Sequence, residues 1–259
     1  MSTVPLLHIE GGVATLTLNR PQHRNRLQLD DLQVLLAHIE ALQHRSDVRL
    51  VLLTAQVLED KPVFSAGFDL GAFEAEGGQA SVGFEAVPDA LARLPQLTLA
   101  AINGSIYGGA TDLAMACDFR IGVTGMLFKI PAAALGLHYY PSGMQRFVAR
   151  LGLGAARRIF LKAEQLRDIE LLHMGYLDEL IVPEHWAIKR DAWVQHLAAM
   201  APLAVQGMKQ TLNEMAHGEI NDALRRRWHS REQLTQLSHD FAEGRRAHAE
   251  KRAPHFLNK

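Results

Sequence analysis

The feature that most restricts the fold of this chain is the alternation of strand-like and helix-like runs along its first half. Adjacent Gly11 and Gly12 join two strand-like runs, and paired glycines suit a tight hairpin because both can adopt positive φ. Apolar spacing predicts strands at 6–10, 13–18, 48–54, 98–102 and 119–123, and helices at 29–45 and from Gly108-Gly109 to about Cys117. Alternation of this kind indicates an α/β fold.

The second half of the chain has a different pattern. Helix is expected almost continuously after about residue 141, from Arg157 to Met174 and again from Trp186 to the end. We divide the chain into a core at 1–198 and a helical C-terminal segment at 199–259, which is basic and amphipathic. In the first half, Gly71 to Gly83 is expected to form a loop or a frayed helix.

Composition excludes several classes of protein. Lys and Arg total 27 against 28 Asp and Glu, so the near-neutral chain has no general attraction to nucleic acid or an anionic membrane. No run approaches the roughly 20 apolar residues of a membrane span, and Met1 to Glu10 lacks signal-peptide features, so a cytoplasmic location is expected. The single cysteine, Cys117, is expected to be buried rather than reactive. The 13 histidines are scattered without metal-ligand spacing, so no metal is expected.

Two glycine-rich junctions carry the strongest chemical signal. Residues 64–70 read FSAGFDL, and small residues there allow a tight turn whose backbone N–H groups point outward. Residues 103–112 read NGSIYGGATD and lead from a strand into the start of a helix, where unpaired N–H groups and the helix dipole favour an anion. Either motif alone is compatible with an ordinary turn.

Together and in this order, the two motifs resemble those of the crotonase superfamily, the enoyl-CoA hydratase/isomerase family. The resemblance rests on FSAGFDL at 64–70 and NGSIYGGATDLAMACDFRI at 103–121, with support from LNRP at 18–21, Asn25 and the closing residues 250–256. It covers essentially the whole chain. It implies a crotonase-like spiral of β-β-α units, followed by a helical segment that builds homotrimers, often paired into hexamers.

The resemblance also implies an acyl-CoA substrate, usually in fatty acid metabolism, which brings its own coenzyme A and needs no further cofactor. The residues that match the family's oxyanion hole are Phe68 and Gly109, whose backbone N–H groups would hold the thioester oxygen as it becomes an enolate. Phe68 replaces a more usual alanine. Its ring is expected to narrow the acyl pocket.

The acids of the family's hydratases are altered in this chain. Those enzymes use two glutamates, and this chain has Asp112 at one position and Ala132 at the other. The shorter aspartate draws its carboxylate back by roughly 1.5 Å, and about 1 Å of misplacement can cost ~100-fold. The resemblance therefore implies a lyase or isomerase with Asp112 as the acid–base candidate, but not an efficient two-glutamate hydratase.

Two alternatives stay open. His138, Tyr139 and Tyr140 stand where the family usually has a glycine-rich turn, and Tyr139 matches a tyrosine of decarboxylases such as methylmalonyl-CoA decarboxylase. Those decarboxylases tend to have histidine at the position of Phe68, so the match is partial, and the aromatic residues could simply fill the pocket wall. The second alternative, suggested by Ala132, is a homologue that binds acyl-CoA without turnover.

Further contacts follow from the resemblance. Arg24 and Lys61 stand where the family contacts the coenzyme A phosphates, Ala66 lies in the first turn beside the ligand, and Phe256 matches a tail aromatic near the adenine. Asp69 and Asp118 are expected to be structural. Apolar residues of the C-terminal segment predict a face covered by neighbouring subunits: Leu212, Met215, Leu224, Trp228 and Leu234.

Overall fold

The computed structural model describes residues 3–69, 83–217, 223, 226–227, 230, 233–234 and 237–259, with the backbone alone at 217 and 248–249. The loop expected at Gly71 to Gly83 lies outside the described residues apart from Gly83, and so do Leu224 and Trp228 of the expected oligomer face. None of the described helices combines the length and the apolar character that crossing a membrane demands.

The N-terminal hairpin is confirmed. Strands β1 (Leu6–Glu10) and β2 (Val13–Leu18) pair antiparallel, with Glu10 opposite Val13. The linking Gly11 and Gly12 adopt φ values of 57° and 80°, which residues with a Cβ atom rarely take up. Residues of β2 alternate between half-buried and buried, as expected of a strand with one face on the core.

The described strands form two sheets. The larger sheet has the order β1-β2-β3-β5-β7-β10 and the smaller one the order β4-β6-β8-β9. Outside the hairpin the pairs are parallel, except for β8 with β9. The remaining bounds are β3 Leu50–Ala55, β4 Val63–Ser65, β5 Leu97–Ile102, β6 Ser105–Tyr107, β7 Phe119–Val123, β8 Leu127–Lys129, β9 Leu166–Arg167 and β10 Glu179–Ile181.

A helix follows each pair of consecutive strands in the first half of the chain. The helices are α1 (Leu29–Gln43) after β1 and β2, α3 (Ala86–Ala92) after β3 and β4, α4 (Gly109–Met115) after β5 and β6, and α5 (Pro141–Phe160) after β7 and β8. The 3-10 turns η1 (Pro21–His23) and η2 (Ala132–Leu135) precede α1 and α5. The expected spiral of β-β-α units is confirmed.

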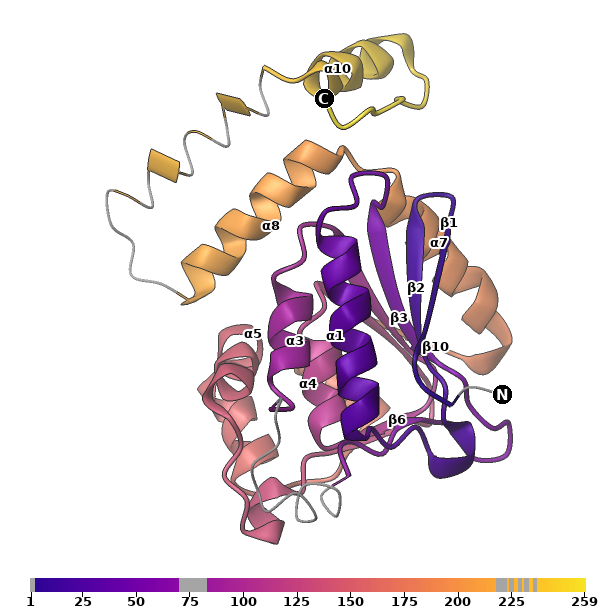
Figure 1. Ribbon diagram of the computed structural model, residues 1–259, viewed down its shortest axis with the longest axis vertical. Helices are drawn as coiled ribbons and strands as arrows, with labels where there is room; N and C mark the ends of the chain where they lie inside the picture. The colour runs from indigo at the N-terminus through magenta and orange to yellow at the C-terminus, as the bar shows by residue number, and fades with distance from the viewer. Residues whose placement is uncertain are drawn as a thin grey trace.

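The larger sheet is covered on both faces. Figure 1 shows α1, α3 and α4 beside one face of the sheet and α7 (Trp186–Ala198) beside the other. Val51 and Leu53 of β3 belong to the main core, whereas Leu50 and Leu52 belong to a second core that packs against Trp193 of α7. Burial on both faces explains the unbroken apolar sequence of β3.

The C-terminal end of α4 is closed by Arg120 of β7, whose side chain is fully buried. Its guanidinium donates to the carbonyl oxygens of Cys117 at 2.5 Å and Tyr176 at 2.7 Å. The backbone N–H of Arg120 donates to the Asp178 carboxylate at 2.7 Å. Burial lowers the pKa of Arg120 to about 10, so the guanidinium stays charged at neutral pH. This one side chain joins α4 and β7 to the segment that precedes β10.

The second half contains more strand than expected. The helix predicted over Arg157 to Met174 is wrong, because α5 ends at Phe160, β9 follows, and α6 spans only Asp168–His173. Between α5 and β9, Ala163 adopts a φ of 48°, and β9 then pairs with β8. Sheet pairing overrides the helical pattern of the sequence here. Within α5 itself, Gly152 is non-helical, with φ 76° and ψ 165°.

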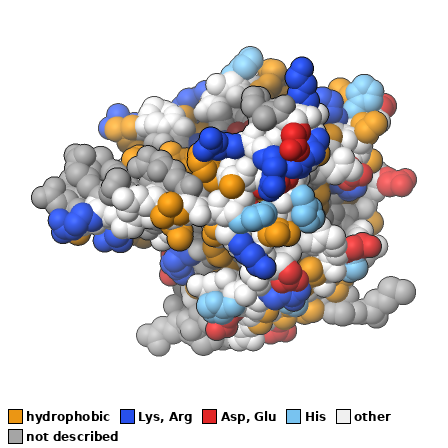
Figure 2. Space-filling model, turned by 90° about the horizontal axis from the view of Figure 1, so that it is seen from above, with side chains coloured by type: hydrophobic (Ala, Val, Ile, Leu, Met, Phe, Trp, Pro, Cys, Tyr) orange, Lys and Arg blue, Asp and Glu red, His pale blue; other side chains and the backbone are white. Residues whose placement is uncertain are grey.

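The C-terminal segment also departs from the expected helix. After η3 (Pro183–His185) and α7, the described helices are α8 (Pro202–His217) and α10 (His239–Glu250), but residues 251–259 fold back instead of continuing as helix. Asp240 accepts hydrogen bonds from the backbone N–H groups of Leu257 at 2.7 Å and Asn258 at 2.8 Å. Glu243 accepts one from Arg252 at 2.6 Å. Seen from above in Figure 2, basic and acidic side chains are interspersed over this end of the molecule.

Candidate active site

The first glycine-rich turn lies after β4 and leaves one backbone donor free. The Gly67 N–H donates to the Ser65 hydroxyl at 3.1 Å, and the Asp69 N–H donates to the Leu27 carbonyl at 2.9 Å. Phe68 pairs with Leu27 as an isolated parallel bridge, and in such a bridge the N–H of the central residue points away from its partner. Among the described residues no group accepts a hydrogen bond from the Phe68 N–H.

The second turn places another free donor beside the first. Gly108 has a φ of 56°, and Gly109 is the first residue of α4, where a backbone N–H has no partner within its helix. A Cβ atom on Gly67, which has a φ of 88°, would lie 2.8 Å from the Tyr107 carbonyl oxygen and 3.4 Å from the Gly109 nitrogen. Only glycine at position 67 therefore allows this approach of the two turns.

A buried polar brace holds the first turn in place. The Asn25 amide donates to the carbonyl oxygens of Gln56 at 2.7 Å and Val63 at 3.1 Å, and its oxygen accepts from the Arg20 N–H at 2.8 Å. The Ser65 hydroxyl donates to the Asn25 carbonyl at 2.7 Å. The asparagine that supported the family resemblance thus links the turn after β2 to β4.

Aromatic rings lie against the two turns. The Phe84 ring occupies the side of Gly109 where a side chain would begin, within 2.7 Å of an ideal Cβ position. Its centroid lies 5.7 Å from that of Phe68 and 6.1 Å from that of Tyr140. These three residues, Phe68, Phe84 and Tyr140, are the aromatic wall of the candidate site. A wall of rings presents apolar surface with few hydrogen-bonding groups.

Asp112 lies in the first turn of α4 and is fully buried. Its Oδ1 accepts from Arg146 Nε at 2.9 Å, and its Oδ2 accepts from Arg146 Nη2 at 2.5 Å and from the Tyr140 hydroxyl at 2.6 Å. Arg146 also donates to Asp89 of α3 at 2.6 Å. Ala132, in η2, is buried and brings no second carboxylate. The carboxylate expected to act as acid or base is thus engaged by a guanidinium and a phenol.

The adjacent tyrosines have different surroundings. Tyr139 is buried, stacks on Tyr140 with centroids 4.4 Å apart and packs against Phe160, and the two hydroxyls are 3.4 Å apart. Burial, together with the Asp112 carboxylate, raises the pKa of Tyr139 well above its usual value, and burial and the neighbouring Tyr139 and Asp112 raise that of Tyr140 strongly. Both phenols therefore stay protonated at neutral pH. His138 is exposed.

The four residues expected to contact coenzyme A do not lie together within one chain. They are Arg24, Lys61, Ala66 and Phe256. The Ala66 N–H donates to the carbonyl oxygen of Arg24 at 2.8 Å, so these two lie side by side at the first turn. The side chains of Arg24 and Lys61 are exposed. Phe256 lies in the tail, where its carbonyl accepts from Arg49 at 2.6 Å, just before the start of β3. The first turn comes after β4, and the chain reaches β4 from the opposite end of β3.

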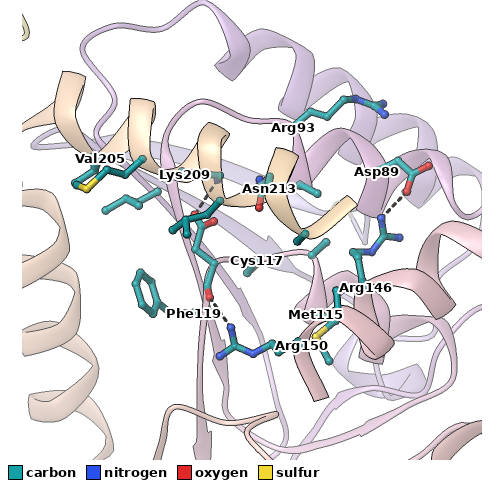
Figure 3. A pocket seen from close by; sticks show the side chains of 18 of the residues that line it. Asp89, Arg93, Met115, Cys117, Phe119, Arg146, Arg150, Val205, Lys209 and Asn213 are labelled. Carbon is teal, nitrogen blue, oxygen red and sulfur yellow. Dashed lines mark hydrogen bonds and ion pairs between the residues drawn. The ribbon is translucent and has the colours of Figure 1, made fainter. Parts of the chain in front are cut away.

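A cavity of about 910 Å³ lies at the other end of α4, between α3, α5 and α8. Its lining is mostly apolar and includes Met208 and Leu212 of α8, which are 57% and 64% exposed. Figure 3 shows Arg146 extending toward Asp89 at one side of the cavity and Lys209 of α8 on another. The cavity borders Asp112's partner Arg146, but not the two glycine-rich turns.

Two expectations about single residues are confirmed. Cys117 is a buried free thiol, and burial raises its pKa to about 12, so it is unreactive near neutral pH. Asp118 is structural, because one of its oxygens accepts from the Thr98 N–H at 2.8 Å and from Lys209 at 2.7 Å. Within the described ranges, no cluster of three or more His, Cys, Asp or Glu side chains is arranged to hold a metal ion.

Arg146, Asp89 and Phe84 belong to the site and were not identified from the sequence. Phe84 follows a segment without a clear pattern, and Asp89 and Arg146 look like ordinary helix-surface charges. The sequence signal that could have drawn attention to this region is Gly143, which stands between the two tyrosines and Arg146. A Cβ atom there would lie 2.6 Å from the Tyr140 ring and 2.7 Å from the Tyr139 ring, so this glycine marks a crowded position.

Comparison with known proteins gives consistent results. The model of the enoyl-CoA hydratase/isomerase family matches residues 8–259. The short-chain-enoyl-CoA hydratase of Clostridium acetobutylicum is 29% identical over 223 residues, which are 85% of this chain and 84% of that protein. A probable enoyl-CoA hydratase, echA6, of Mycobacterium tuberculosis is 31% identical over 251 residues, 94% of this chain and 95% of that protein. The fold matches an enoyl-CoA hydratase/carnithine racemase from Magnetospirillum magneticum with a TM-score of 0.89 at 24% identity, covering 100% of this chain and 97% of that one.

Proposed function

The chain belongs to the enoyl-CoA hydratase/isomerase family, and we propose that it binds an acyl-CoA thioester and stabilises the derived enolate with the N–H groups of Phe68 and Gly109. The observation that carries this proposal is the contact of the two turns at Gly67, which brings together two donors that have no acceptor among residues 3–69 and 83–217 or the other described positions. Preorganised donors of this kind typically contribute 10²–10³-fold each to the rate. The catalytic centre is therefore built from backbone, independent of the Phe68 side chain.

An efficient two-glutamate hydratase reaction is not part of the proposal. Hydration needs one group that activates water and another that delivers a proton. Ala132 supplies neither, and Asp112 would have to give up Arg146 and Tyr140 before it could act. Isomerisation or slow hydration would need Asp112 released from these partners, so that it could take a proton from the α-carbon or orient water.

The engagement of Asp112 favours a second candidate, decarboxylation of an acyl-CoA that carries an α-carboxylate. In that reaction the bond between the α-carbon and the carboxylate carbon breaks, CO₂ leaves, and the electron pair remains as the enolate. Water then supplies a proton to the α-carbon, so the protein needs no base. The aromatic wall offers the departing carboxylate little solvation, and Tyr139 and Tyr140 keep their protons. A homologue that binds without turnover is the remaining candidate.

Ligand contacts beyond the two turns complete the proposal. Arg24 and Lys61 would meet the coenzyme A phosphates, with Ala66 alongside, and Phe256 of a neighbouring subunit would lie near the adenine. The exposed guanidinium and ammonium groups of Arg24 and Lys61 suit phosphate oxygens in a chain of near-neutral net charge. We place the enzyme in the cytoplasm, acting in fatty acid metabolism.

The binding proposal is tested by thermal unfolding in acetoacetyl-CoA. Ligand at ~100 times its Kd should stabilise the fold by about 2.7 kcal/mol. A melting temperature that saturating acetoacetyl-CoA leaves unchanged would contradict the proposed function.

The reaction is then identified by incubating the protein with enoyl-, saturated and α-carboxyl acyl-CoA thioesters. Liquid chromatography with mass spectrometry separates the outcomes. Hydration adds one water, decarboxylation removes CO₂, isomerisation gives a product of unchanged mass at a new retention time, and a binder gives no new product.

A homotrimer, or a hexamer made of two trimers, is proposed for the assembly. Leu212, Met215 and Leu234 are 64%, 46% and 61% exposed in the single chain. Exposed apolar surface of this kind requires cover. Light scattering that finds a 28.7 kDa species at micromolar concentration would contradict the assembly.

A further inference from the structure

Arg146 joins three helices around one buried carboxylate. From α5 it donates to both oxygens of Asp112 on α4 and, through Nη1, to Asp89 on α3 at 2.6 Å. The Arg146 side chain is 12% exposed and that of Asp112 is 0% exposed. A two-pronged contact between a guanidinium and a carboxylate is strong and fixes orientation as well as charge. A second carboxylate, on Asp89, contributes to the balance of the buried positive charge.

A glycine of α5 allows close packing around the pair formed by Arg146 and Asp112. Gly143 lies one turn before Arg146 on α5, and a Cβ atom there would lie 3.0 Å from Asp112 Oδ2 and 2.6 Å from the Tyr140 ring. Any side chain at position 143 would push the tyrosine away from the carboxylate. The glycine therefore allows the Tyr140 hydroxyl to reach Asp112 at 2.6 Å.

Tyr140 carries this arrangement into the candidate site. Its hydroxyl has a single proton, which it donates to Asp112, and its ring forms one end of the aromatic wall beside Phe84. Phe84 in turn lies against Gly109 and beside Phe68, the residues of the two free donors. A chain of direct contacts thus runs from Asp89 through Arg146, Asp112 and Tyr140 to the wall that faces the donors.

We propose that Arg146 is a positioning residue, which holds Asp112 as a fixed acceptor rather than as a base so that Asp112 orients Tyr140 in the acyl-binding wall. The proposal rests on the proposed acyl-CoA function and names which carboxylate is withdrawn from acid–base chemistry. Tyr140, rather than the more deeply buried Tyr139, is then the tyrosine that touches the acyl group. Arg146 acts only through Asp112 and Tyr140.

The test measures selectivity for the acyl group, the ratio of the Kd of free coenzyme A to that of acetoacetyl-CoA, by calorimetry. Arg146→Met and Asp112→Asn should lower this ratio about tenfold, the size expected for one lost hydrogen bond in a buried site. Tyr140→Phe should lower it by a similar or smaller factor. The double variant Arg146→Met/Tyr140→Phe should lower the selectivity ratio no further than the single variant with the larger effect, because both changes break the same chain of contacts.

Arg150→Met is the matched control. Arg150 lies one turn further along α5 and pairs with Asp178 at 2.6 Å, outside the chain of contacts to Tyr140. The Arg150→Met variant should leave the selectivity ratio unchanged, even if the substitution alters stability. Arg146→Lys keeps the charge but not the two-pronged geometry, so it should fold and recover only part of the ratio. If Arg146→Met does not fold, Arg146→Lys, Asp112→Asn and Tyr140→Phe carry the test.

The outcomes separate this proposal from the function on which it rests. Wild type that binds neither coenzyme A nor acetoacetyl-CoA would overturn the proposed function. Wild type that binds both, with ratios unchanged in Asp112→Asn and in the Arg146 variants, would overturn the positioning role alone. It would also be overturned if Asp112→Asn kept the ratio but slowed turnover of a substrate from the thioester panel by 100-fold or more, because Asp112 would then be the acid or base.

Discussion

The two ends of α4 treat their unpaired backbone groups in opposite ways. At the N-terminal end, neither the Gly109 N–H nor the nearby Phe68 N–H donates to any group in the described part of the chain. At the C-terminal end, the buried Arg120 guanidinium donates to the carbonyl oxygens of Met115 at 3.3 Å and Cys117 at 2.5 Å. A helix of this length leaves several such groups unpaired at each end. One end keeps its unpaired donors for a ligand, and the other satisfies its acceptors within the protein.

One end of α4 therefore serves ligand binding and the other serves stability. Unsatisfied donors favour an anion but contribute nothing to folding until the anion binds. Satisfied acceptors around a buried charge contribute to folding and would be costly to disturb. Changes at the Arg120 end should therefore mainly alter stability, and changes at the Gly109 end should mainly alter binding. A variant that altered both properties would show that the two ends are coupled.

The largest effect is expected from Arg120→Met. The variant leaves several buried carbonyl oxygens without a donor, so the free energy of unfolding should fall by about 3–5 kcal/mol, and Tm by roughly 6–20 °C. Urea denaturation measures the loss. Arg158→Met is the control, since its side chain is 45% exposed in surface ion pairs, and it should cost less than about 1 kcal/mol. Weaker acetoacetyl-CoA binding by folded Arg120→Met would show that the two ends are not independent.

Gly67→Ala addresses the ligand end. The new Cβ would lie 2.8 Å from the Tyr107 carbonyl oxygen at a residue with φ 88°, so the turns must separate. Affinity for acetoacetyl-CoA should fall at least tenfold, with a stability cost of about 1–3 kcal/mol. Gly125→Ala is the matched control, because Gly125 has a φ of 84° but nothing within 4 Å of the added atom. It should share the backbone strain and keep full affinity by calorimetry.

The two tyrosines allow a smaller and sharper comparison. Tyr140→Phe removes a hydrogen bond to a buried carboxylate, so unfolding free energy should fall by about 1.5–3 kcal/mol. Tyr139→Phe removes only a hydroxyl 3.4 Å from its neighbour, and should cost under about 1 kcal/mol. Guanidinium denaturation of both variants checks the order. A larger loss for Tyr139→Phe would mean that the wrong phenol has been assigned to Asp112.

The smallest effect is expected at the C-terminal tail, where Glu243 accepts hydrogen bonds from residues that fold back on α10. Hydrogen bonds from the Arg252 side chain and the His255 N–H lower the pKa of Glu243 to about 2 from its ordinary value of 4.5. A lowered pKa stabilises the tail fully above pH 4.5, and this contribution is lost as pH falls from 4.5 toward 2. The protection factors of residues 251–259, which are corrected for the intrinsic pH dependence of amide exchange, should therefore fall over that range. Glu243→Gln should remove this pH dependence, and protection factors that stay constant in wild type would contradict the assignment.

Local signals in the sequence account for the parts that were predicted well. The paired glycines fix the hairpin, and the strand at 119–123 matches β7 because its apolar residues, Phe119, Ile121 and Val123, alternate along the chain. Strands of two or three residues, such as β9 and β10, are too short to show any periodicity and exist through their partners. The family motifs located both turns. They could not reveal the Arg146 contact with Asp112, which spans 34 residues and depends on how α4 and α5 pack.

Arg120 also sets the order in which this chain can assemble. The Tyr176 carbonyl that receives its guanidinium lies 56 residues later in the chain, and the Asp178 carboxylate 58 residues later. During synthesis, the Arg120 guanidinium cannot make these two contacts until residues 176–178 have emerged, so we expect α4 and β7 to become stable only together with β10. Contacts this distant in sequence are made late and slow folding. In pulse-labelled hydrogen exchange, we expect α4 to gain protection together with β10, in a single closing step.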